Sequence, residues 1–110
     1  ALSANPSVIT CLANDVSYDS IYSEQLKVKA DKGDMLIVLS GSGNSPNVIE
    51  AIKFANKLEV NTFSILGFNG GECKKISKHC IHFSIDDMQI SEDLQLIVCH
   101  ICMQWLSNQL

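Results

Sequence analysis

The stretch LIVLSGSGNSPNVIEAI, residues 36–52, changes character in its middle and constrains the fold more than any other part of the chain. Leu36–Leu39 is a continuous apolar run, which is typical of a central parallel strand covered by helices on both faces. The small and polar residues Ser40–Ser45 follow, and Pro46 then opens a segment with helical spacing. The stretch therefore predicts a strand, a tight loop and a helix in immediate succession.

The rest of the chain continues this alternation of strand and helix patterns. In chain order, we expect two short helices within residues 5–30, the strand at Leu36–Leu39, a helix at Pro46–Leu58, a strand at Val60–Leu66, a short helix at Glu72–Lys78, a strand at Cys80–Ile85 and a long helix at Met88–Leu110. Alternating units of this length predict a three-layer α/β/α sandwich around a parallel sheet. With 110 residues, the chain is expected to form one domain, 1–110.

Charge argues against nucleic acid as a direct ligand. The net charge is −4, and the eight basic residues are scattered lysines with no run that could follow a phosphodiester backbone. The chain contains no arginine, the usual bidentate partner of phosphate. Any phosphate bound by this chain must therefore rely on hydroxyl groups, backbone N–H groups or lysine.

Neither a membrane nor an oxidising compartment is expected. The longest mostly apolar stretch, Leu94–Leu106, contains polar residues and is shorter than the roughly 20 residues of a membrane span. Five cysteines are an odd number and are widely spread, so we expect reduced thiols and a cytoplasmic location.

The loop between the strand and the helix has the composition of an anion site. The start of a helix carries unpaired N–H groups and partial positive charge, and small residues let a ligand approach them closely. The loop supplies hydroxyls from Ser40, Ser42 and Ser45, and it contains Gly41. The same residues would also suit a tight turn that binds nothing, so both interpretations remain open at this point.

A nucleotide cofactor is not expected at this loop. The dinucleotide fingerprint G-x-G-x-x-G lacks its third glycine, because Pro46 stands there, and no acidic residue ends the next strand. A phosphate-binding Walker sequence is also absent, since no Gly-Lys-Ser or Gly-Lys-Thr follows.

The segment LSGSGNSPNVIEAIKFANK closely resembles the signature of the sugar isomerase (SIS) domain. The similarity extends to AND before SYDSIYSEQL, to GDMLIVLSGSGNS and to EDLQLIVCH, and it points to the phosphoheptose isomerase branch of that family. The resemblance implies a flavodoxin-like, doubly wound fold and a sugar phosphate substrate. It also implies conversion of sedoheptulose 7-phosphate to D-glycero-D-manno-heptose 7-phosphate for bacterial lipopolysaccharide, by a homodimer or homotetramer.

The resemblance assigns roles to six residues before the long helix. Ser40, Gly41, Ser42 and Ser45 match the family's phosphate and substrate loop, and Asn14 and Asp15 match a pair that touches the sugar. From the residues alone, Asn14 and Asp15 fit a turn at the end of a helix equally well.

Glu92 and His100 are the candidates for proton transfer on the long helix. Aldose–ketose isomerisation needs groups that exchange protons near neutral pH, and these two lie eight residues apart, about 80° around the helix. The resemblance implies that His100 is a metal ligand and a catalytic acid or base. Glu92 stands where zinc-binding members have glutamine, so zinc bound by Glu92 and His100 is implied less directly. The alternatives are an acidic residue favourable to the helix dipole and a hydrogen-bonded histidine.

One part of the resembled active site has no counterpart in this chain. In the family, an N-terminal helical region carries a Gly-Asn-Gly-Gly-Ser-like loop and the His and acidic residue that complete a zinc site. We therefore expect the chain to be a C-terminal portion of a longer protein. The competing hypothesis is a non-catalytic SIS module, such as a DnaA initiator-associating-like protein.

Overall fold

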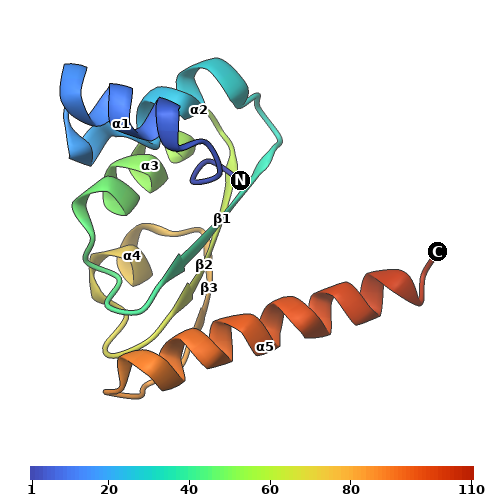
Figure 1. Cartoon of the computed structure of the whole chain (residues 1–110). Helices are drawn as coiled ribbons and strands as arrows, with labels where there is room; N and C mark the ends of the chain where they lie inside the picture. The colour runs from blue at the N-terminus through green and yellow to red at the C-terminus, as the bar shows by residue number, and fades with distance from the viewer.

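The computed structural model describes residues 1–110 and shows a parallel sheet with helices on both of its sides (Figure 1). The elements in chain order are α1 (Pro6–Asp15), the short 3-10 helix η1 (Tyr18–Ser20), α2 (Ser23–Lys29), β1 (Met35–Ser40), α3 (Pro46–Lys57), β2 (Asn61–Leu66), α4 (Gly71–Ile76), β3 (His79–His82) and α5 (Met88–Ser107). The predicted α/β fold with a parallel sheet is confirmed.

The three strands lie in the order β1-β2-β3, and both pairs are parallel. The register places Leu39 beside Ile65 and Ile65 beside Ile81. β3 ends at His82, three residues earlier than the strand pattern predicts. The chain beyond β3 leaves the ladder because Ile85 accepts a hydrogen bond from the amide of Phe68, in the loop that follows β2. All three strands end at the same edge of the sheet.

The hydrophobic core lies between the sheet and helices α2, α3 and α4. Its two clusters are Leu26, Ala51, Ala55 and Val60, and Val38, Ile52, Leu66 and Cys73. Both clusters contain residues of α3, and Ile52 and Ala55 of this helix are completely buried. Burial also raises the pKa of the Cys73 thiol to about 11, so that this cysteine behaves as an apolar core residue.

The opposite face of the sheet is covered only in part. Alternate residues of β1, which are Met35, Ile37 and Leu39, are exposed on this face, while Val38 and Ser40 are buried. The expected cover on both faces of this strand is therefore absent from the chain, because α5 packs on β2 rather than on β1. Ser91 and Gln95 are the buried residues of α5, and Gln95 Nε2 donates a hydrogen bond to Ile65 O at 3.2 Å.

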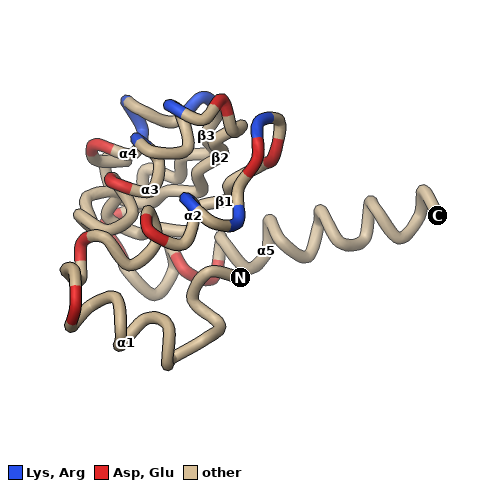
Figure 2. The backbone as a smooth tube through the Cα atoms, turned by 90° about the horizontal axis from the view of Figure 1, so that it is seen from above, with Lys and Arg blue, Asp and Glu red and all other residues tan.

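The second half of α5 extends away from the rest of the molecule (Figures 1 and 2). Ile97, Ile101 and Trp105 are at least half exposed there, whereas Val98 is partly buried. No charged residue follows Asp93 in the sequence, and Figure 2 shows this segment without acidic or basic positions. None of the helices combines the length and the apolar character that a membrane span requires.

Truncation of the core at α3 should be costly. We expect Ile52→Ala to lower the free energy of unfolding by about 2 to 5 kcal/mol, because a fully buried side chain leaves a cavity beside Val38 and Leu66. Val28→Ala on α2 is the matched control, since Val28 is 86% exposed and should change stability by less than about 0.5 kcal/mol. Chemical denaturation of both variants measures the difference, and equal losses would contradict the assigned core.

Candidate functional site

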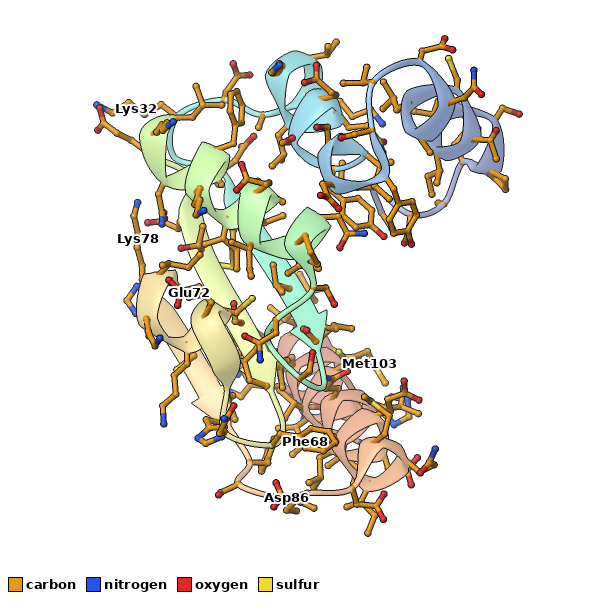
Figure 3. The ribbon with its side chains drawn as sticks, turned by 90° about the vertical axis from the view of Figure 1, so that its left-hand side faces the viewer. Lys32, Phe68, Glu72, Lys78, Asp86 and Met103 are labelled. Carbon is orange, nitrogen blue, oxygen red and sulfur yellow. The ribbon has the colours of Figure 1, made fainter.

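The loops that follow β1 and β2 lie together at the carboxyl edge of the sheet. We call Ser40–Ser45 the serine loop and Gly67–Gly70 the glycine loop. They are joined by a hydrogen bond from the amide of Gly67 to Gly41 O at 2.9 Å. Figure 3 shows Phe68 of the glycine loop and Asp86, just before α5, at this end of the sheet, with Lys32 at the opposite end. Ligands of open parallel sheets bind at this edge, so the loops form the candidate site.

The serine hydroxyls are held ready to donate hydrogen bonds. Ser40 Oγ accepts a hydrogen bond from the amide of Gly43 at 3.1 Å, and Ser42 Oγ accepts one from the amide of Asn44 at 3.2 Å. Each hydroxyl oxygen is thereby oriented, and neither hydroxyl donates a hydrogen bond within the chain. Ser45 stands at the N-cap position of α3, but its side chain makes no capping hydrogen bond, so its hydroxyl is also available.

Backbone amides around the start of α3 are available as well. The N–H groups of Ser42, Ser45 and Asn47 have no hydrogen-bond partner within the chain. Pro46 occupies the first helical position, where it has no N–H group to leave unpaired. Unpaired amides and the positive end of the helix dipole favour an anion at this point.

Asn47 is a candidate site residue that the sequence patterns did not single out. It lies in the first turn of α3 and is 7% exposed, yet its side-chain amide makes no hydrogen bond within the chain. Every side-chain N or O atom that is fully enclosed has a hydrogen-bond partner. Because the Asn47 amide has none, it is not fully enclosed and keeps some contact with solvent. The available signal was a polar residue directly after Pro46 in an amphipathic helix.

Asn14 and Asp15 lie at the end of α1 and are exposed. Asn14 Nδ2 donates to Asp15 Oδ1 at 2.8 Å, and Cys11 Sγ donates to Asp15 Oδ2 at 3.4 Å. These two hydrogen bonds, with that of Asn14 the stronger cause, lower the pKa of Asp15. No hydrogen bond connects the pair to the serine loop, so contact with a sugar stays a prediction.

Glu92 and His100 are both exposed on α5. Glu92 follows Ser91, which lies against Gly67 of the glycine loop so closely that a Cβ atom on Gly67 would collide with it. His100 lies about 12 Å further along the helix axis, given 1.5 Å per residue. The structure thus places the turn that carries Glu92 next to the site and carries His100 away from it.

The side chains of this chain do not by themselves fit a zinc centre. Zinc sites in proteins use at least three protein ligands, and no group of three His, Cys, Asp or Glu side chains comes together here. Glu92 and His100 could contribute to such a centre only with further ligands from elsewhere.

Curated proteins similar to this chain are named phosphoheptose isomerases. The chain is 38% identical over 101 residues to a probable phosphoheptose isomerase of Thermoplasma acidophilum, a match that covers 92% of the chain and 56% of the relative. It is 31% identical over 110 residues to the phosphoheptose isomerase of Akkermansia muciniphila, covering 100% of the chain and 58% of the relative. The chain therefore spans somewhat more than half the length of these relatives.

Solved structures show the same architecture. The phosphoheptose isomerase of Neisseria gonorrhoeae matches with a TM-score of 0.89 and 28% identity, over 92% of this chain and 57% of the other. That of Francisella tularensis matches with a TM-score of 0.85 and 26% identity, over 93% and 56%. The family model of the SIS domain matches residues 1–67, which is more than half of the chain, and the chain thus belongs to the SIS domain family.

Proposed function

We propose that this chain is the phosphate-binding part of a cytoplasmic phosphoheptose isomerase. The reaction would convert sedoheptulose 7-phosphate to D-glycero-D-manno-heptose 7-phosphate for lipopolysaccharide synthesis. The observation that carries the proposal is the serine loop, where free hydroxyl protons and unpaired amides meet at the start of α3. The phosphoheptose isomerases that share the fold support the choice of substrate.

Phosphate recognition would use these donors in place of arginine. The hydroxyls of Ser40, Ser42 and Ser45 would donate to the phosphate oxygens, and the amides of Ser42 and Ser45 would add to them. Hydroxyl and amide donors can bind a phosphate dianion without a cationic side chain, because the helix dipole contributes partial positive charge.

Proton transfer would involve Glu92 and His100. Isomerisation moves one proton between neighbouring carbons and another between their oxygens, so it needs an acid and a base. Glu92 lies in the turn of α5 beside the glycine loop and is the better placed of the two. His100 would take part only where another segment or subunit encloses α5.

Asn14 and Asp15 would contact the sugar hydroxyls. A zinc ion, if used, would need ligands besides Glu92 and His100.

Phosphate binding should depend on the serine hydroxyls. We expect Ser42→Ala and Ser45→Ala each to weaken the binding of sedoheptulose 7-phosphate by about 10- to 100-fold, the range for a hydrogen bond to a charged group. Ser7→Ala on α1 is the matched control, since that hydroxyl is exposed and makes no hydrogen bond of its own. Titration calorimetry on the full-length protein measures the effect, and unchanged binding by both variants would contradict the proposed site.

A second candidate function is a non-catalytic phosphosugar-binding module. The exposure of Glu92 and His100 and the absence of a three-ligand cluster favour it.

His100→Ala separates the two functions. In an isomerase it should lower turnover of sedoheptulose 7-phosphate by at least about 100-fold, the usual contribution of an acid or base. His79→Ala, at the start of β3, is the control. A complete wild-type protein that binds this sugar without turning it over would support the module instead.

Association into a homodimer or homotetramer is part of the same proposal. The uncharged second half of α5 exposes apolar side chains on several sides, as does the uncovered face of β1. A helix that is apolar all round is stable in water only when other elements cover it.

Disruption of this helix should therefore change the molecular mass in solution. We expect Trp105→Glu to shift the protein towards a monomer in light scattering, because a charge cannot be buried without a partner. Gln89→Glu, in the first turn of α5, adds the same charge at a position favourable to the helix dipole and should leave the mass unchanged. A wild-type monomer at high concentration would contradict the proposed association.

A further inference from the structure

The first amides of helix α4 are capped by side chains and carbonyl groups other than those of its N-cap residue. Its N-cap residue is Gly70, which has no side chain to offer to the first amides of the helix. Asn69 Oδ1 accepts a hydrogen bond from the amide of Gly71 at 3.0 Å, and the serine loop provides acceptors for the next two amides. The amide of Glu72 donates to Asn44 Oδ1 at 3.0 Å, and the amide of Cys73 donates to Gly43 O at 2.9 Å. The serine loop therefore helps to cap a distant helix, since Glu72 lies 28 residues after Asn44 in the sequence.

The contact between the serine loop and the start of α4 is too close for side chains. Gly43 and Gly71 both have positive φ, at +67° and +54°. A Cβ atom on Gly43 would collide with the carbonyl group of Gly70. A Cβ atom on Gly71 would lie 2.6 Å from Ser42 O, Gly43 O and Asn44 Oδ1. Backbone thus packs on backbone, and a shift of one segment must displace the other.

Asn44 connects this contact to the proposed phosphate donors. Its Nδ2 donates to Ser42 O at 3.3 Å, and its backbone amide donates to Ser42 Oγ at 3.2 Å. One residue therefore binds the first turn of α4 on one side and orients Ser42 on the other. The first turn of α4 is itself fixed to the core, because Cys73 is fully buried with Val38 and Ile52.

We infer that Asn44 is a positioning residue for sugar phosphate binding, which holds the serine loop in its binding geometry by capping α4. Asn44 acts through Ser42 and not as a contact to the phosphate. The inference rests on the proposed function for its ligand, while the clamp between the loop and α4 can be tested without any ligand.

Asn44→Ala removes the acceptor of the Glu72 amide and the donor to Ser42 O together. In hydrogen exchange followed by NMR, we expect the Glu72 amide to exchange about two- to tenfold faster, as for the net loss of one hydrogen bond at the surface. With sedoheptulose 7-phosphate, KM should rise about tenfold while kcat stays within about threefold, because uniform binding energy is lost. Asn61→Ala is the matched control, since Asn61 is exposed and its side chain makes no hydrogen bond.

Gly71→Ala tests the same contact without altering any polar group. The new methyl group would press on Ser42 O and Gly43 O. Gly33→Ala is its control, because Gly33 also has a positive φ, of +93°, but no atom within 4 Å of the added Cβ. Both variants bear the strain of the left-handed backbone. Only Gly71→Ala should raise KM, by about tenfold or more, because it displaces the Ser42 donor of a hydrogen bond to the charged phosphate.

The results separate the inference from the proposed function. Unchanged exchange of the Glu72 amide in folded Asn44→Ala would overturn the clamp, whatever the protein binds. Faster exchange together with unchanged KM in both Asn44→Ala and Gly71→Ala would overturn the positioning role. A wild-type protein that binds no sugar phosphate would overturn the proposed function and, with it, the role of Asn44 in binding, whereas the exchange result would still decide the clamp. A parallel fall in kcat and thermal stability at constant KM would mean that Asn44 is only structural.

Discussion

Packing of α3 against β1 and β2 is the interaction on which the rest of the structure depends. Ile52 is completely buried against Val38 and Leu66, and Cys73 of α4 closes the same cluster. This packing sets the point at which α3 begins relative to the end of β1. The chain between Ser40 and Pro46 must then turn within a few residues, which small residues allow. The hydrophobic core thereby places hydroxyls and amides at the edge of the sheet.

The chemistry of that edge follows from what the chain lacks. Without arginine, a phosphate must be held by hydroxyls, backbone N–H groups, the helix dipole or lysine, and the neutral donors are effective when they are oriented beforehand. The hydrogen bonds from Gly43 and Asn44 to the serine hydroxyls provide that orientation. The glycine-mediated contact with α4 then ties the loop to the core. Rigidity of the loop is thus a consequence of the same packing that stabilises the fold.

Exposed apolar residues are unevenly distributed over the surface. The face of the sheet that carries α3 is well covered, whereas Ile37 and Leu39 on the other face, and the second half of α5, are exposed. The chain spans 56–58% of its curated relatives, and its apolar surface suits cover by further protein. α5 packs on the sheet through its first turns, where Ser91 and Gln95 are buried. His100 lies beyond these turns and is therefore distant from the serine loop.

The sequence by itself determined the local elements and the nature of the loop. An unbroken apolar run, a cluster of Ser and Gly, and proline before a helical period are short-range signals, so the strand, the serine loop and α3 could be predicted from them. The bond from Glu72 to Asn44, the burial of Asn47 and the distance of His100 from the site were decided only by the tertiary structure. Each depends on how segments far apart in the sequence pack across the parallel sheet, and no pattern within one segment records that packing.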